Sequence, residues 1–344
     1  MKHLIIFALL LVSCTSVTEK IFVANEESGT ISVIDASSLT VIDTITLTTD
    51  HDGARLEFTP HNVQTTGDFV LVTANVGGYA HDNHGAIPSV EAHGDESAEE
   101  PEHPDQLVII DARTHTIVKR TDIDFEAHLA HVVSDGTVAY VTGTNTDALY
   151  AVNFNNGSKR MIELPAGSKP HGFRLSPDNL TAYIASMNNA LLILDLKTKQ
   201  LKSVPLPGMG VQTAVLGDYA FVSVYSPAQI GRYNTLTGNM TFVSLPHAAG
   251  PIQIYPSGDF IYVADQGTLN GDLPGNTLYK INAETLDVIA LIAGNAPHGV
   301  VVADNRVFVT NLLGGTVSVF ANDSVVAEIP VGAAPNGITY WHAR

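Results

Sequence analysis

Ala296-Pro297-His298-Gly299-Val300 is the stretch that decides the fold, because the chain repeats it in three other places. Ser168-Lys169-Pro170-His171-Gly172 keeps the Pro-His-Gly core, Thr59-Pro60-His61-Asn62-Val63 keeps Pro-His, and Ala334-Pro335-Asn336-Gly337-Ile338 has Asn in place of His. The copies inside the chain precede a turn and a short apolar strand, such as Val307-Phe308-Val309-Thr310. A unit that recurs about every 40 residues is typical of a repeat architecture.

Short strands rich in β-branched residues follow one another from Glu19 onward, and Gly, Ser, Asn and Asp separate them. Strands of the Phe-Val-Thr type occur seven times, at 21–24, 69–73, 138–142, 182–185, 219–222, 260–264 and 306–310. The strands that precede them also number seven, with positions near 61, 131, 171, 212, 253, 298 and 336. The pattern therefore predicts seven repeats of similar sheets.

The order of the strands indicates a closed ring. The chain begins with the second strand of a unit and ends with the first strand of one, so residues 337–341 can complete the sheet that begins at Lys20. Such closure leaves no exposed sheet edge. A parallel β-helix is the competing repeat fold, but its repeats are shorter. We expect an all-β, seven-bladed β-propeller, a single domain over residues 19–344, closed by pairing of the N-terminal strands with the C-terminal strand.

The N-terminus has the features of a secretory signal. An apolar run from Leu4 to Val12 follows Lys2 and precedes Ser13-Cys14, and it is too short to span a membrane. The end of this run resembles a bacterial lipobox, in which the Cys is lipidated; a plain signal peptide with a chance Cys is the alternative. We expect a signal peptide over 1–13, a linker over 14–18 behind lipidated Cys14, and an extracytoplasmic, lipid-anchored protein in the periplasm or at the cell surface.

The overall charge excludes two classes of partner. The formal net charge is −18 at pH 7, and charged residues make up only 15% of the chain. A protein that binds nucleic acids or anionic membrane surfaces needs clustered Lys and Arg. We therefore expect no nucleic-acid partner, and a membrane contact through the lipid anchor only.

Residues 76–106 interrupt the repeat with a long polar insertion. It is acidic, almost without aliphatic residues, and contains four histidines: His81, His84, His93 and His103. Such a composition predicts a flexible loop, and long loops in compact domains are usually functional or disordered. The histidines and carboxylates of this loop are candidate residues for capturing a metal ion. A solvated acidic insertion without a ligand is the alternative.

Blade geometry places the loop and the repeated histidines on one face. An inner strand starts on the face to which the connection from second to third strand returns, so the loop, His51 and His247 should lie there as well. His61, His171 and His298 are equivalent by alignment and should line the central channel. A fourth histidine comes from Ala127-His128-Leu129-Ala130-His131, where the choice between His128 and His131 stays open.

Three or four converging imidazoles suit zinc, with copper as the alternative. Cys14 is the only cysteine, so a thiolate-rich site is excluded. Histidines that only cap their strands or bind channel water are the competing interpretation. If a metal binds, its affinity should fall below a pH of about 6.5, because imidazoles must be neutral to ligate. The chain has no Gly-x-Ser-x-Gly elbow, no phosphate-binding glycine loop and no cysteine for haem attachment, which favours a binding protein over an enzyme.

The recurring motifs Val-Thr-Asn, Gly-Thr-Val-Ser-Val and Pro-His-Gly-Val resemble those of the YVTN-type β-propeller repeat family. The resemblance covers essentially the whole mature chain. Residues 21–35 and 307–320 match best, and the units at 208–245 and 250–292 depart from it. The chain is also similar to the periplasmic zinc metallochaperone propellers, which have seven blades, a channel-side histidine site and a segment rich in His, Asp and Glu.

The second resemblance implies a metal-binding propeller that sequesters or delivers zinc, or copper. The ion would be captured by residues 81–103 and transferred to His61, His131, His171 and His298, and a metal-transport protein would be the partner. Two other functions remain open: a cell-surface scaffold without a metal, and a copper redox enzyme that resembles the propeller domain of nitrous oxide reductase.

Overall fold

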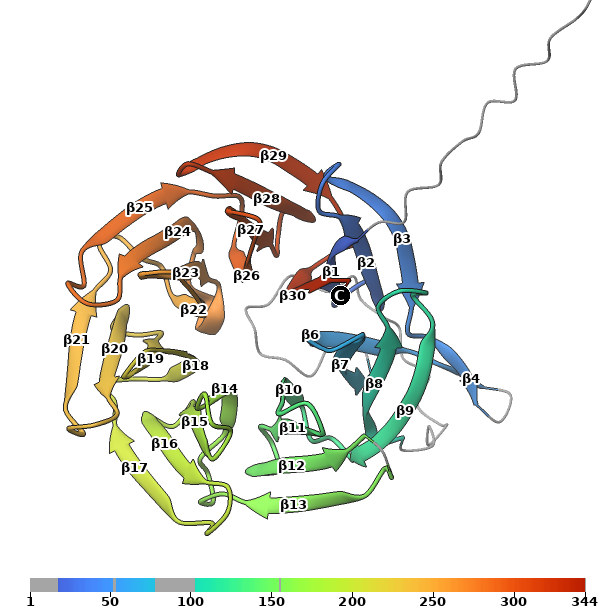
Figure 1. Cartoon of the computed structure of the whole chain (residues 1–344), viewed down its shortest axis with the longest axis horizontal. Coiled ribbons are helices and arrows are strands. Elements are labelled where there is room, and N and C mark those ends of the chain that lie inside the picture. The colour runs from blue at the N-terminus through green and yellow to red at the C-terminus, as the bar shows by residue number, and fades with distance from the viewer. Residues whose placement is uncertain (1–17, 52–53, 78–102, 155, 344) are drawn as a thin grey trace, which may run out of the picture.

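The repeated strands form seven four-stranded antiparallel sheets, which stand as blades around a central channel (Figure 1). A computed structural model describes residues 18–51, 54–77, 103–154 and 156–343. The described residues contain no α-helix, and the one helical element among them is the short 3₁₀ turn η2 (Leu269–Gly271). The prediction of an all-β, seven-bladed propeller is confirmed.

Each blade runs from an inner strand at the channel to an outer strand at the rim. The inner strands are β6 (Phe58–Thr66), β10 (Leu129–Ser134), β14 (Pro170–Leu175), β18 (Gly210–Leu216), β22 (Pro251–Ser257), β26 (Pro297–Ala303) and β30 (Pro335–His342). The second strands are β1 (Glu19–Asn25), β7 (Phe69–Val76), β11 (Val138–Gly143), β15 (Thr181–Ser186), β19 (Tyr219–Val224), β23 (Phe260–Gly267) and β27 (Arg306–Asn311).

The third strands are β2 (Thr30–Asp35), β8 (Asp105–Asp111), β12 (Ala148–Asn153), β16 (Ala190–Asp195), β20 (Gln229–Asn234), β24 (Pro274–Asn282) and β28 (Thr316–Ala321). The outer strands are β3 (Thr40–Thr46), β9 (Ile117–Asp124), β13 (Lys159–Glu163), β17 (Leu201–Pro205), β21 (Met240–Ser244), β25 (Val288–Ile292) and β29 (Ser324–Pro330). Between β3 and β6, β4 (Thr49–His51) and β5 (Ala54–Leu56) form a separate hairpin.

The core lies between neighbouring blades, because the second and third strands are buried on both faces. In β1, Phe22 packs with Val70 of the following blade, whereas Ile21 packs with Phe308 of the preceding one. Successive side chains of a strand point to opposite faces, so one apolar run serves two interfaces. This explains the near-continuous apolar sequences of these strands.

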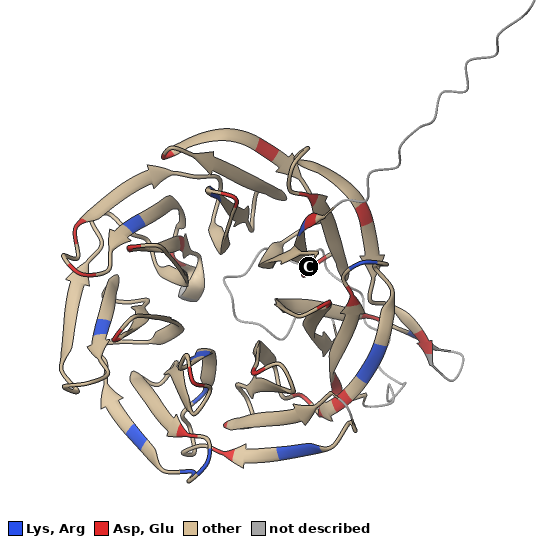
Figure 2. Ribbon diagram, viewed as in Figure 1, with Lys and Arg blue, Asp and Glu red and all other residues tan. Residues whose placement is uncertain are grey.

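Lys and Arg residues recur on the outer strands. Figure 2 shows Lys and Arg on the outer strands β9, β13 and β17. The seven inner strands contain no Asp, Glu or Lys, and their one Arg is Arg174 in β14. The inner strands therefore present neutral and apolar groups with a single permanent cation.

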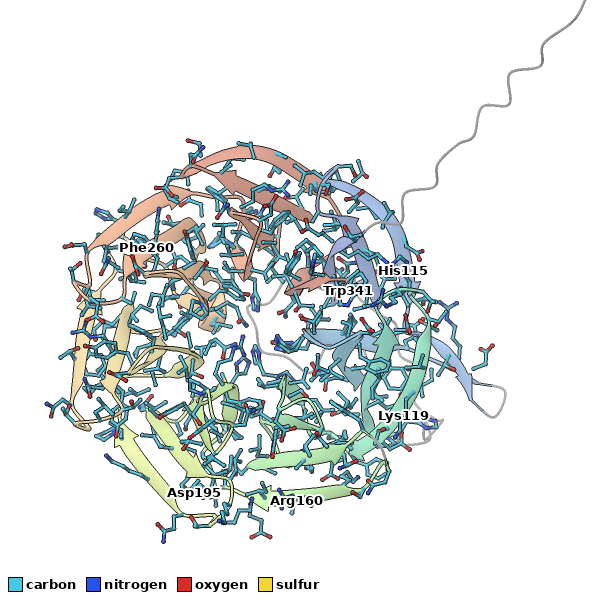
Figure 3. All side chains as sticks on the ribbon, viewed as in Figure 1. His115, Lys119, Arg160, Asp195, Phe260 and Trp341 are labelled. Carbon is cyan, nitrogen blue, oxygen red and sulfur yellow. The ribbon has the colours of Figure 1, made fainter. Side chains whose placement is uncertain are left out.

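The ring closes where the sequence predicted, between β1 and β30. Ile21 pairs with Tyr340 and Val23 with Ile338 in an antiparallel ladder. Beside them Trp341 is buried, with the Lys20 ammonium 5.1 Å from its ring centroid. Lys20 also donates to the carbonyl of Ala112 (2.9 Å) in the next blade, which ties the closed ends to their neighbour. Figure 3 shows Trp341 well inside the rim positions of Arg160 and Asp195.

Each inner strand begins with a β-bulge, and this bulge positions the site. In the blade that contains β6, Pro60 pairs with Ala74 and Val63 with Val72, so His61 and Asn62 together oppose the single residue Thr73. The same register shift occurs in all seven blades. A bulge bends the strand and re-aims the side chains of the extra residues.

In four blades a hydroxyl group fills the gap in the ladder at the bulge. The Thr142 hydroxyl accepts a hydrogen bond from the backbone N–H of His131 (3.1 Å) and donates to the carbonyl of His171 (2.6 Å) in the next blade. The same two bonds recur at Thr73, Ser223 and Thr310. One buried hydroxyl thus links the bulges of two neighbouring blades.

We predict that Thr142→Val lowers the free energy of unfolding by about 1–3 kcal/mol, because it leaves the buried N–H of His131 and the carbonyl of His171 without this partner at nearly constant volume. Thr142→Ser keeps the hydroxyl and should lose less. Urea denaturation of the three proteins is the measurement. A Val variant as stable as the wild type would contradict the role given to this hydroxyl.

Some predicted features fall outside the described residues. These are Cys14, the signal segment 1–13, and the loop histidines His81, His84 and His93. Within the described ranges, no helix has the length and apolar character needed to cross a membrane.

Candidate metal centre

Three histidines from consecutive blades meet in the channel. His61 in β6, His131 in β10 and His171 in β14 are buried, and one ligand nitrogen of each lies within 4.8 Å of the others. A tetrahedral zinc ion with Zn–N bonds of 2.0–2.1 Å needs nitrogens about 3.4 Å apart. The group is therefore already assembled, and a shift of about 1 Å in side-chain position would give ligand geometry.

The three rings reach this point from two different bulge positions. Leu129 pairs with Gly143 as Pro170 pairs with Ser186, so the residue equivalent to His171 is Ala130. His131 takes the second bulge position, which Gln212 and Gln253 occupy in their own blades. Sequence alignment had placed either His128 or His131 at the first position, and the register shows that neither occupies it.

His128 lies beside the three-histidine group. Its ring centroid is 5.2 Å from that of His61 and 6.4 Å from that of His171. It is half-buried, whereas the three grouped rings are fully enclosed. The structure thus separates the two candidates by depth, with His131 in the group and His128 closer to solvent.

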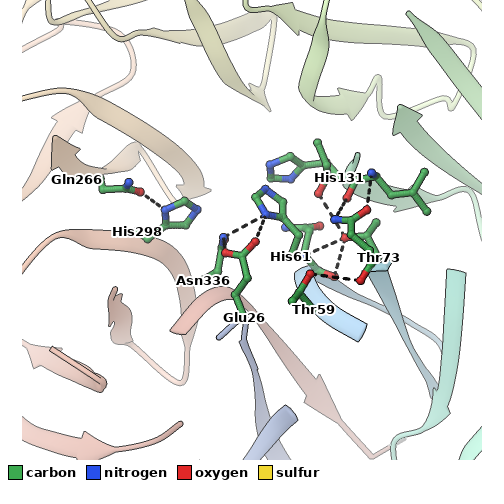
Figure 4. A network of polar contacts seen from close by, with 12 residues as sticks. Glu26, Thr59, His61, Thr73, His131, Gln266, His298 and Asn336 are labelled. Atoms are coloured by element: carbon green, nitrogen blue, oxygen red, sulfur yellow. Dashed lines mark hydrogen bonds and ion pairs between the residues drawn. The ribbon is translucent and has the colours of Figure 1, made fainter. Parts of the chain in front are cut away.

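Hydrogen bonds at Nδ1 orient two of the rings, and the neutral form of each then has Nε2 as its ligating nitrogen. The Nδ1 of His61 lies 2.9 Å from a carboxylate oxygen of Glu26, and the Nδ1 of His171 lies 3.0 Å from the carbonyl oxygen of Val211 (Figure 4 shows the Glu26 contact). Both oxygens can only accept, so Nδ1 carries the proton and Nε2 carries the lone pair. Metal-ligating histidines almost always have such a partner on the second nitrogen.

Glu26 is a site residue that the sequence did not reveal. It is buried directly after β1, and its second carboxylate oxygen accepts from the side-chain amide of Asn336 (2.7 Å). Gln266, near the end of β23, holds the equivalent place in its blade and accepts from Nδ1 of His298 in the following blade. A polar residue at the end of a second strand, one blade before a Pro-His copy, was the available signal.

His131 contacts two glutamine amides instead of an acid, and its neutral ring, with one acceptor nitrogen, accepts a hydrogen bond from one of them. Its Nδ1 lies 3.2 Å from the Gln212 side-chain nitrogen and its Nε2 lies 3.3 Å from that of Gln253. Burial, and then the charges that His171 and His61 would carry, hold the pKa of His131 well below 6.5. The ring is therefore neutral at neutral pH, as a ligand must be.

His298 stands apart from the group of three. Figure 4 places it across the channel from His131, next to Gln266. It shares a narrow cavity of about 10 Å³ with Glu26, His61 and His171. His51 lies in the β4–β5 hairpin, and His247 is exposed in the connection before β22.

Asp105, at the end of the predicted loop, forms hydrogen bonds to the other end of the loop and to the backbone of His128. His103 is half-buried just before β8, and Asp105 starts that strand. The Asp105 carboxylate accepts hydrogen bonds from the backbone N–H of Val76 (2.8 Å) and of His128 (3.0 Å). Burial raises the pKa of Asp105 to about 6. Both described ends of the insertion therefore lie next to His128.

Comparison with solved structures supports the class of protein, a seven-bladed β-propeller. Virginiamycin B lyase from Staphylococcus aureus is 15% identical, with 82% of this chain and 91% of that chain covered and a TM-score of 0.64. Apo AztD from Citrobacter koseri is 13% identical, with 95% and 98% covered and a TM-score of 0.61. At such identities the likeness concerns the fold alone. No family model matches the chain, and no curated protein matches it in sequence.

We predict that His131 makes the metal-free protein less stable as the pH falls. Below the unfolded-state pKa of 6.5 the unfolded ring binds a proton that the folded ring does not, so the free energy of unfolding decreases with pH in that range. His131→Gln should reduce this slope by up to about 1.4 kcal/mol per pH unit between pH 6 and 5. Denaturation curves at several pH values test this, and parallel profiles for both proteins would refute it.

Proposed function

We propose that this chain is an extracytoplasmic metal-binding propeller that sequesters or delivers a transition metal, with zinc favoured over copper. One observation carries the proposal: three buried histidines from consecutive blades hold ligand nitrogens within 4.8 Å of one another, and an acceptor fixes the tautomer of two of them. Orienting partners of this kind are typical of metal-binding histidines.

The ligand types favour zinc or copper over harder cations. Imidazole nitrogens suit both metals, whereas magnesium and calcium prefer oxygen ligands. Glu26 is already engaged by His61 and Asn336, so it serves to orient a ligand. A tetrahedral zinc ion on three histidines keeps one position for an exchangeable ligand. His128, the ring beside His61 and His171, is the nearest candidate for that position.

A route to the centre completes the proposal. His81, His84, His93 and His103, with the carboxylates around them, would collect the ion and pass it inward. The hydrogen bonds of Asp105 to Val76 and His128 support this route, because they place the ends of the insertion beside the half-buried ring. His298, in the same narrow cavity, would be a further contact for the ion.

The cellular setting of the proposal rests on the sequence. Cys14 would carry the lipid anchor, and the protein would lie in the periplasm or at the cell surface. A metal-transport protein would be its partner, as in the zinc metallochaperone propellers, and the blades would belong to the YVTN repeat type. In this proposal the metal ion is cargo and not a catalytic cofactor.

The test is a measurement of bound metal on protein purified without an affinity tag. We expect one zinc or copper ion per chain to survive dialysis, and His171→Ala to weaken binding at least 100-fold in a chelator competition. His247→Ala removes an exposed histidine and should leave the affinity unchanged. A wild-type protein without submicromolar affinity for either metal would reject the proposal and favour the scaffold alternative.

Glu26 provides a second test that leaves every ligand in place. We predict that Glu26→Ala lowers zinc affinity about 10–100-fold, because the acceptor that orients His61 is lost. Glu26→Gln keeps an acceptor oxygen, as Gln266 does for His298, and should cost less. Glu27→Ala changes the exposed neighbour and is the matched control. Equal affinities for Glu26→Ala and Glu27→Ala would show that Glu26 has no role in the site.

A further inference from the structure

Arg174 is the only Lys, Arg, Asp or Glu on the seven inner strands, and nothing in the metal proposal uses it. It follows His171 by three residues along β14, so it lies further from the strand starts than the histidine group does. The outer strands carry several Lys and Arg residues, whereas Arg174 is the single charged residue of the inner strands. A single cation on the inner strands therefore suggests a role outside the proposed metal site.

Arg174 lines a second cavity, which we call the lower channel cavity. Its volume is about 70 Å³, and its lining shares no residue with the narrow cavity at the histidines. The polar side chains around it are those of Asn62, Gln64, Thr65, Gln253, Tyr255 and Thr339. One water molecule occupies roughly 10–15 Å³ on this scale, so the cavity has room for several waters or for one small oxyanion.

The charge of Arg174 is not balanced by a carboxylate. Among the described residues Arg174 forms no ion pair, and its guanidinium donates to the carbonyl of Phe173 (2.8 Å). Burial lowers the pKa of Arg174 to about 10, so the group is still a cation at neutral pH. A cation inside a protein is costly without a compensating charge. The neutral amides and hydroxyls of the cavity supply none.

The donor chemistry of the cavity points to the kind of ligand. A guanidinium presents its N–H groups in a planar fork that matches two oxygens of an oxyanion. Burial raises the pKa of the Tyr255 hydroxyl, so this group remains an O–H that can donate. The volume excludes nucleotides and sugars and leaves small anions of three to five heavy atoms.

We propose that the lower channel cavity is a binding site for one small oxyanion, such as bicarbonate, formate, sulfate or phosphate, held by the guanidinium of Arg174. The site takes another class of ligand than the histidine group, although Gln253 lines this cavity and also contacts Nε2 of His131. The anion proposal can therefore be tested independently of the proposed metal function.

The test uses the metal-free, full-length protein and titrates each of these four anions by calorimetry at constant ionic strength. We expect saturable binding of at least one of them at one equivalent per chain. Arg174→Met should weaken that binding at least tenfold, and Arg174→Lys should weaken it less because it keeps the charge. Arg232→Gln, which changes an arginine that bonds to the carbonyl of Ala283 in the outer part of a blade, is the matched control.

Thermal unfolding separates specific binding from general salt effects, since sulfate and phosphate stabilise most proteins by exclusion from their surface. If the site is specific, the unfolding midpoint of the wild type rises with anion concentration and then levels off. The midpoint of Arg174→Met should lack this saturable rise. The proposal is overturned if no anion gives a saturable signal with the wild type, a result that does not depend on whether any variant folds. It is also overturned if wild type and Arg174→Met bind alike.

Discussion

The β-bulge at the start of every inner strand is the constraint on which the site depends. Two residues of the inner strand oppose one residue of the second strand, so their side chains leave the regular alternation and turn toward the channel. The hydroxyl groups of Thr73 and Thr142 satisfy the backbone groups that the bulge leaves over, and they do so across the boundary between blades. Ring closure then brings seven such bulges together around one axis.

The channel combines this geometry with an unusual electrostatic environment. Glu26 places a carboxylate against His61, and Arg174 supplies a cation further along. Burial, and the charges that His171 and His61 would carry if protonated, keep the pKa of His131 well below its usual value. Such a channel would bind two kinds of ligand, one in each of its cavities: a metal dication at the histidines and a small anion at Arg174.

Local strand patterns predicted the fold, whereas contacts between blades decided the details of the site. The periodicity of apolar residues predicted the seven repeated strand motifs and the ring closure seen in the pairing of Ile21 with Tyr340, because each strand carries its own apolar pattern. The convergence of His61 and His171 was foreseen from the Pro-His copies. The place of His131 was not, because a bulge moves a side chain by one position without leaving a mark in the residue pattern. Glu26 was missed because it contacts a ring that is 35 residues away in the next blade.

The sequence by itself therefore determined the class of fold, the number of blades and the closure of the ring. These are properties of local strand patterns and of their repetition. The tertiary structure alone decided which rings meet, which nitrogen carries the lone pair, and which side chains beyond the Pro-His copies hold them. Those features depend on distances between blades of a few ångströms, which arise only when bulges, hydroxyl links and ring closure act together.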